Sequence, residues 1–361
     1  MINEKYLKNE EKIALSLRSL YSKYGYLPYK MSKFEEYDLY ADKKDFLISD
    51  RIITFTDTAG KLMALKPDVT LSIIKHTANE AGTKQKVYYC ENVYRVLGSA
   101  KEFNEIMQVG LECVGDIDAY DEYEVISLSA QSLEEISKSY VIEVSHMGIL
   151  NAVLEKINKD SAFRTEILDA VKKKSKHEIE KTLERYSCNE MGELIYPLIS
   201  VSANPECALS ELEGLNVSDS FTGALSELKE LFALLKDTPY YDRLRIDFSI
   251  VNDMNYYNGL VFNGYVEGVC ECVLYGGRYD KLLKKMGREQ GGIGFAIYTE
   301  LLNGLNKSNQ KYDVDVLLIY KDTSSIREVK ATIEEQIKQG KSVSAQRAIP
   351  DKLRYRELLE I

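Results

Sequence analysis

The feature that most constrains this chain is a long helical stretch set between two groups of strand-forming segments. Strand-like segments recur between residues 51 and 115 and again from residue 244, whereas residues 148–238 have an almost wholly helical pattern. We expect the strands before and after the helical stretch to pair in one sheet. Their alternation of apolar and polar residues is typical of an antiparallel sheet. The sequence therefore predicts an α+β fold, with an antiparallel sheet that is flanked by helices and interrupted by a helical insertion.

Local signals assign the segments before the insertion. Apolar spacing predicts an amphipathic helix over residues 5–24, closed by Gly25 as a C-cap glycine. Two β-rich runs around Thr58-Ala59-Gly60 predict a hairpin that leads into a third, strand-like segment, LKPDVT. Further elements are predicted as strands at 85–95 and 105–115 and as a helix at 121–139.

The length of 361 residues allows two or more domains, because domains of about 150 residues are common. Strand patterns resume at LRIDFSIVND, and the chain closes with a β-α-β pattern followed by a charged stub. We predict a core formed by residues 1–147 and 239–306, a helical insertion at 148–238, and a short, truncated α/β unit at 311–361.

The charge balance restricts the partners. With 47 basic against 57 acidic residues the net charge is −10, so a broad surface for phosphate backbone is not expected. The basic run Lys172–Lys176 is typical of a solvated helix face, with nucleic acid as an alternative partner. Nothing in the chain resembles a signal peptide or a membrane span, so we expect a cytoplasmic protein without a membrane partner.

Residues for metal or nucleophilic chemistry are sparse. The three histidines, His76, His146 and His177, are far apart, and no serine lies in a G-x-S-x-G turn. No phosphate-binding glycine loop is present. The sequence therefore predicts neither a metal nor a cofactor. The six cysteines are predicted to be free thiols: Cys90, Cys113, Cys188, Cys207, Cys270 and Cys272.

Alternation along the predicted strands gathers polar side chains on one face. The apolar face of EIMQVGLECVG holds Met107, Val109, Leu111 and Cys113. Its opposite face holds Gln108, Gly110 and Glu112. The same alternation in LMALKPDVT directs Met63, Leu65 and Val69 toward the core and Lys66, Asp68 and Thr70 away from it. In RIDFSIV the predicted core residues are Ile246, Phe248 and Ile250.

These polar faces have two interpretations. Each strand taken alone is typical of a solvent-facing edge. Taken together, Asp68, Thr70 and Gln108 could accept the three hydrogen bonds of an α-amino group. Glu112 and Tyr257 could hold an imidazole ring between them. The second interpretation predicts a site for a small cation or ammonium compound.

Several segments, in this order, resemble the catalytic core of histidyl-tRNA synthetase, a class II synthetase. YGYLPYKMSKFE resembles the region of motif 1, LKPDVT the histidine-binding strand, and YRVLGSAKEFNEIMQVGLECVG motif 2. NDMNYYNGLVF and YGGRYDKL resemble the two histidine-specific signatures, and GGIGFAIYTELL resembles motif 3. The likeness runs from about Tyr24 to Leu305, apart from the insertion, and implies a class II synthetase-like sheet.

The resemblance also implies roles for individual residues. Asp68, Thr70 and Gln108 would hold the amino group of histidine, and Glu112 and Tyr257 its ring. The remaining members would line the pocket or meet the carboxylate. The full set of histidine-binding residues that the resemblance implies is Asp68, Thr70, Arg95, Gln108, Glu112, Tyr256, Tyr257, Arg278 and Tyr279.

The chain departs from the synthetase pattern where ATP is activated. Synthetases neutralise the triphosphate with three arginines, and only Arg95 matches one of them. Leu301 and Asn252 stand at the other two positions, and losing one such group typically lowers a rate by about 10²–10³. The motif 2 loop lacks the family's Arg-Glu-Arg clamp, and Ser32 replaces the interface proline of motif 1. These departures predict a protein without its own catalytic residues.

The C-terminal unit is about half as long as the anticodon-binding domain of a synthetase. A synthetase-like body that keeps a histidine pocket but lacks adenylation residues resembles the regulatory subunit family of ATP phosphoribosyltransferase. The resemblance implies a subunit that activates the short-form catalytic subunit, at the first step of histidine biosynthesis, and relays feedback inhibition by L-histidine. It also implies a homodimer within a larger hetero-oligomer.

Two alternatives remain. One is an active histidyl-tRNA synthetase with degenerate motifs, which histidine-dependent ATP–pyrophosphate exchange would reveal. The other is a nucleic-acid-binding paralogue that senses uncharged tRNA through the basic run Lys172–Lys176. Binding of tRNA that weakens steeply with added salt would support this second alternative.

Overall fold

The structure is a computed structural model that describes residues 7–41, 51–78, 82–96, 102–200, 204–251, 256–305, 311–321 and 324–361. The chain forms two compact units, Met1–Leu305 and Asn306–Ile361. Within the first unit, the division into a core and a separate insertion domain stays a prediction.

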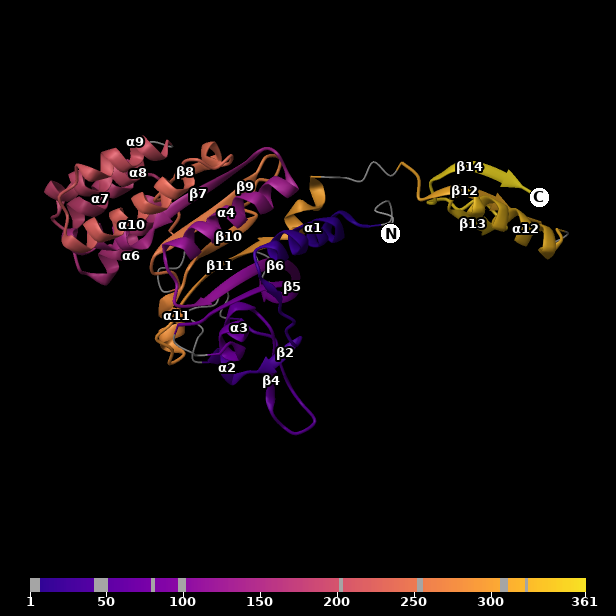
Figure 1. Ribbon diagram of the computed structural model, residues 1–361, viewed down its shortest axis with the longest axis horizontal. Helices are drawn as coiled ribbons and strands as arrows, with labels where there is room; N and C mark the ends of the chain where they lie inside the picture. The colour runs from indigo at the N-terminus through magenta and orange to yellow at the C-terminus, as the bar shows by residue number, and fades with distance from the viewer. Residues whose placement is uncertain are drawn as a thin grey trace. The chain divides into compact units, whose positions relative to one another are not determined.

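An eight-stranded mixed sheet organises the first unit (Figure 1). Its strand order is β1-β5-β6-β11-β10-β9-β7-β8, so three late strands lie between β6 and β7. Neighbouring strands are antiparallel except for two parallel pairs, β1 with β5 and β7 with β8. The predicted α+β fold with a mainly antiparallel sheet is confirmed. The strands are β1 (Leu27–Pro28), β5 (Lys84–Val96), β6 (Phe103–Gly115), β7 (Tyr140–His146), β8 (Leu244–Ile246), β9 (Leu260–Val266), β10 (Leu274–Arg278) and β11 (Gly291–Tyr298).

Two long helices, α1 (Asn9–Lys23) and α4 (Ala119–Ile136), lie side by side on one face of this sheet (Figure 1). The predicted first helix is confirmed, and Gly25 ends it with a left-handed φ of 80°. Asp118 caps α4 by accepting hydrogen bonds from two amides of its first turn. The opposite face carries two shorter helices, α3 (Thr70–His76) and α11 (Asp280–Lys285).

A run of helices fills the region between β7 and β8, as the sequence pattern predicts. Each buries an apolar stripe at helical spacing, for example Phe163 and Ile167 on α6. No helix within the described ranges is both long and apolar enough to cross a bilayer. The helices are α5 (Met147–Ile157), α6 (Ser161–Lys172), α7 (Lys176–Arg185), α8 (Gly192–Ser200), α9 (Pro205–Glu213) and α10 (Asp219–Leu235).

A small second sheet lies near the N-terminus, with the order β2-β4-β3. The predicted hairpin is confirmed as β3 (Thr54–Thr56) and β4 (Leu62–Leu65), and β2 (Phe34–Glu36) pairs with β4. The short helix α2 (Asp38–Ala41) follows β2.

The prediction that LKPDVT continues as a strand is wrong. β4 ends at Leu65, and α3 begins at Thr70. Pro67 lacks an amide hydrogen and cannot extend the ladder of β4. Asp68 accepts a hydrogen bond from the amide of Leu71, 2.9 Å away, in the first turn of α3. Ala64 is fully buried, whereas the predicted core residues Met63 and Leu65 are partly exposed.

The second unit confirms the predicted β-α-β pattern with β12 (Val314–Ile319), α12 (Ile326–Lys338) and β13 (Val343–Gln346). The interpretation of the last residues as a charged stub is wrong, because β14 (Tyr355–Glu360) pairs in parallel with β12. Its sequence YRELLE does not alternate, and the buried centre of β12 provides the partner that orders it.

Candidate ligand-binding site

A cavity of about 480 Å³ opens on the face of the large sheet that carries α3 and α11. Strands β5, β6, β10 and β11 contribute its floor, and the residues before β9 contribute one wall. Of the nine predicted histidine-binding residues, eight line this cavity. They are Asp68, Thr70, Arg95, Gln108, Glu112, Tyr256, Tyr257 and Tyr279.

The alternation predicted along β6 is confirmed. Val109, Leu111 and Cys113 are fully buried in the core shared with α1 and α4, and Gln108 and Glu112 face the cavity. The alternative of a solvent-facing polar edge is wrong for this strand, since Gln108 is 2% exposed and Glu112 is 3% exposed. Polar groups buried on the floor of a cavity, rather than in a packed core, are typical of a binding site.

Gly110 lies between these two polar residues, where close packing leaves no room for a side chain. A Cβ atom on Gly110 would lie 2.3 Å from the carbonyl oxygen of Phe295 and 2.6 Å from the hydroxyl of Tyr89. Any larger residue would therefore displace the neighbouring backbone. A glycine between Gln108 and Glu112 is thus required by the packing, because Tyr89 fills the space that a side chain would take.

Glu112 is held by two hydroxyl donors. Thr70 donates to one carboxylate oxygen at 2.7 Å, and Tyr279 donates to the other at 2.5 Å. Burial raises the pKa of Glu112 to about 8, although both donors oppose the shift. Near neutral pH the carboxyl of Glu112 is therefore protonated, and it can give its proton to a basic ring.

This raised pKa makes stability depend on pH. Between pH 5 and pH 7 the carboxyl of Glu112 ionises in the unfolded chain but stays protonated in the folded one. We expect this residue to lower the free energy of unfolding by about 1.4 kcal/mol for each pH unit in that range. The loss begins above the unfolded pKa and is complete above the folded value of about 8.

Urea unfolding of the wild type and of Glu112→Gln at pH 5, 6 and 7 measures this contribution. The variant should gain stability relative to the wild type as the pH rises, because glutamine does not titrate. The same difference at all three pH values would contradict the raised pKa.

Arg95 already has several partners. Its guanidinium donates to the carbonyl oxygen of Pro67 at 2.5 Å and to the hydroxyl of Tyr298 at 3.0 Å, and it lies 3.5 Å from a carboxylate oxygen of Asp68. Burial raises the pKa of Asp68, and Arg95 opposes that shift. The long contact to Arg95 leaves the Asp68 carboxylate able to accept from a ligand ammonium group.

Three tyrosine side chains form the wall beside Glu112. The ring centroid of Tyr256 lies 4.7 Å from that of Tyr257 and 5.9 Å from that of Tyr279. A Cβ atom on Gly277 would lie 2.6 Å from the ring of Tyr257, so this glycine makes room for the wall. An aromatic wall next to an ionisable carboxyl suits a planar, basic ring.

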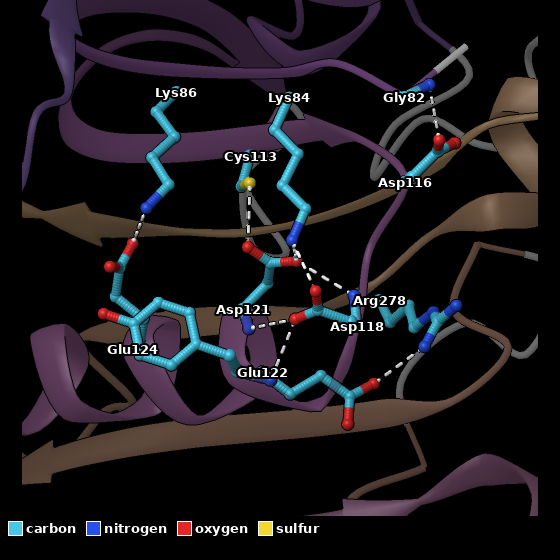
Figure 2. Close-up of polar contacts among 11 residues, drawn as sticks. Gly82, Lys84, Lys86, Cys113, Asp116, Asp118, Asp121, Glu122, Glu124 and Arg278 are labelled. Atoms are coloured by element: carbon cyan, nitrogen blue, oxygen red, sulfur yellow. Dashed lines mark hydrogen bonds and ion pairs between the residues drawn. The ribbon is translucent and has the colours of Figure 1, made fainter.

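Arg278 is the one predicted residue that does not line the cavity. It donates to Glu122 and to Asp280, each at 2.9 Å. Figure 2 shows it next to the first turn of α4, where Lys84 contacts both Asp118 and Asp121. Alternation along β10 explains this position, because Arg278 follows Gly277 and points to the opposite face of the sheet.

Sequence reasoning missed part of the cavity. Tyr275 and Tyr298 line it with ring centroids 5.4 Å apart, and strand alternation would have found both. Lys172 also lines it, but from α6, and no sequence signal connects that helix to the sheet. Leu301 lines the cavity as well, whereas Asn252 lies outside the described residues.

Sequence comparison gives two findings. A profile of the histidyl-tRNA synthetase family matches residues 2–302. The chain is 25% identical over 344 residues to a protein of Ruminiclostridium cellulolyticum named ATP phosphoribosyltransferase regulatory subunit, covering 91% of this chain and 80% of the relative. Relatives from several Bacillus species carry the same name. The resemblance drawn from the motifs is confirmed.

Two solved structures share the fold. One is an ATP phosphoribosyltransferase regulatory subunit/histidyl-tRNA synthetase from Bacillus halodurans, with a TM-score of 0.80 and 21% identity, covering 99% of this chain and 95% of that one. The other belongs to an ATP phosphoribosyl transferase (HisG:HisZ) complex from Thermotoga maritima, with a TM-score of 0.63 and 21% identity, covering 81% and 98%. At these identities the likeness concerns the fold.

Proposed function

The chain belongs to the histidyl-tRNA synthetase family, and from that membership we propose that it acts as a regulatory subunit of ATP phosphoribosyltransferase and not as a synthetase. Relatives with that name match most of the chain. One observation carries the proposal: Leu301, at the position of the motif 3 arginine, lines the same cavity as the amino-acid-binding groups. A leucine cannot neutralise a triphosphate.

The effector in this proposal is L-histidine, bound in the cavity. Its ammonium group donates to Asp68, Thr70 and Gln108, and its ring lies between Glu112 and the tyrosine wall. A histidine sensor must bind its ligand differently in the active and the inhibited assembly, because equal affinities shift no equilibrium. A coupling of about 1–3 kcal/mol is typical of such regulation.

The partner in this proposal is a short-form catalytic subunit, and the chain itself forms a homodimer within the hetero-oligomer. The small β2-β4-β3 sheet supports a dimer, because one of its faces is apolar and open. Phe34 is 46% exposed and Phe55 is 38% exposed, with their ring centroids 5.5 Å apart. A monomeric mass for the purified chain in light scattering would contradict the homodimer.

Co-expression with a short-form catalytic subunit tests the proposal. We expect the two chains to co-purify, the phosphoribosyltransferase rate to rise when this chain is added, and histidine to lower it. The chain alone should give no histidine-dependent ATP–pyrophosphate exchange. A robust exchange signal would instead support the synthetase alternative.

A further inference from the structure

The carboxylate of an amino acid in this cavity needs a positive partner. The ammonium group and the ring of histidine have acceptors in Asp68 and Glu112, but neither of these can serve a carboxylate. Across the described residues that line the cavity, the cationic side chains are Arg95 and Lys172. Arg95 is 3% exposed and is already bound by Pro67, Tyr298 and Asp68.

We infer that Lys172 binds the carboxylate of the ligand, an assignment that rests on the proposed histidine site. Lys172 is the last residue of α6 and is exposed to solvent. In the part of the chain that the structure describes, it forms no ion pair or hydrogen bond. The other charged members of the same basic run are engaged: Lys173 with Glu178 at 3.0 Å, Lys174 with Asp247 at 2.5 Å and Lys176 with Glu180 at 3.9 Å.

The turn after α6 fixes where Lys172 lies. Lys174 adopts a left-handed conformation with a φ of 51°, and its amide donates to the carbonyl oxygen of Val171 at 2.8 Å. Its side chain binds Asp247, which is 8% exposed and follows β8. The end of α6 is therefore tied to the chain that continues from β8 to Val251.

Val251 lines the cavity together with Lys172. The next residue, Asn252, stands where the synthetase pattern has an arginine, and it lies outside the described residues. Lys172 of α6 thus brings a positive charge to the cavity beside Val251, one residue before the position where the synthetase pattern has an arginine. The sequence indicates the basic run Lys172–Lys176 only as a solvated helix face, whereas this assignment makes its first residue, Lys172, a ligand-binding residue.

This assignment gives the ligand two anchors on different parts of the first unit. Glu112 belongs to β6 of the sheet, and Lys172 belongs to the helices between β7 and β8. A ligand with both a basic ring and a carboxylate connects them, whereas a ligand without a carboxylate reaches the sheet alone. Bound histidine therefore connects α6 to the sheet through Lys172. This contact is made only when histidine is bound, as regulation by a ligand requires.

Isothermal titration calorimetry with L-histidine and L-histidinol tests the assignment. Histidinol keeps the ring and the ammonium group but carries an alcohol in place of the carboxylate. Lys172→Gln should weaken histidine binding about tenfold or more and change histidinol binding by less than about twofold. Lys172→Arg should keep most of the affinity for histidine. The matched control is Lys173→Gln, because Lys173 pairs with Glu178 and does not line the cavity.

A structural readout accompanies the affinities. Amide hydrogen exchange in α6 should slow when histidine is bound and should not slow with histidinol. Equal losses for both ligands in Lys172→Gln, or no loss for histidine, would overturn the role of Lys172 while leaving the histidine site in place. If the wild type binds neither compound, the proposed histidine site itself is contradicted, and the assignment of Lys172 falls with it.

Discussion

Replacing Glu112 by glutamine is expected to weaken histidine binding by about 100-fold or more without loss of the fold. The carboxyl is buried, and the proposed imidazole would form a charge-assisted hydrogen bond with it. Removing one partner of such a buried pair costs about 2–5 kcal/mol of binding energy. An amide can still pair with the hydroxyls of Thr70 and Tyr279, which lie at 2.7 and 2.5 Å from the native carboxyl.

The pH profile of affinity identifies the ring as the partner of Glu112. In the complex, one proton is shared between the ring and the carboxyl. Wild-type affinity should be highest between the pKa of the free ring, about 6.5, and that of Glu112, about 8. Below this range the ring must lose a proton on binding, and above it the site must take one up. Glu112→Gln should keep the decline below pH 6.5. Above pH 8 its decline should be shallower than that of the wild type, because only the loss of the ligand's ammonium proton then weakens binding.

Calorimetry from pH 5.5 to 9 measures both effects. Glu105→Gln is the matched control, because Glu105 is exposed on the same strand and does not line the cavity. Unchanged affinity in Glu112→Gln, or a loss of the same size in Glu105→Gln, would remove Glu112 from the site.

Gly294→Ala is expected to destabilise the protein by about 4 kcal/mol or more. A Cβ atom at this position would lie 2.0 Å from a carboxylate oxygen of Glu112 and 2.3 Å from the carbonyl oxygen of Leu111. The second clash involves backbone in the paired strand β6, and rotation of a side chain does not relieve it. The side chain of Glu112 would also be displaced from Thr70 and Tyr279.

Urea unfolding monitored by circular dichroism measures this loss, with Gly223→Ala as the control. Gly223 lies within α10, and a Cβ atom there would meet no atom within 4 Å. Alanine is the better helix former by about 1 kcal/mol, so the control should be stabilised. A Gly294→Ala variant as stable as the wild type would show that β11 can move away from β6.

Much of the fold can be predicted from the spacing of apolar residues, without knowledge of tertiary contacts. The alternation of β6 predicts both the buried face with Val109 and Leu111 and the polar face with Gln108 and Glu112. The helical periodicity of the insertion is equally visible. These elements are long, and in each the apolar residues recur at one regular spacing on a single buried face. The local sequence pattern is therefore enough to predict them.

The failures share a physical cause. LKPDVT looks like a strand, but Pro67 cannot extend the ladder and Asp68 accepts a hydrogen bond from the first turn of α3. β14 forms because β12 offers it an edge. Arg278 follows a motif yet lies on the far face of β10. Lys172 reaches the cavity through the way two distant segments pack. Such placements depend on tertiary contacts that a single sequence does not encode locally.

The position of β9, β10 and β11 between β6 and β7 has a consequence for synthesis on the ribosome. When β7 emerges, its neighbours in the sheet have not been translated, and the backbone N–H and C=O groups on one edge of β6 stay unpaired while six helices are made. Only once Tyr298 has left the exit tunnel can the two halves join. A small molecule that fits the cavity therefore cannot stabilise a chain stalled before that point, because β11 forms part of the cavity floor.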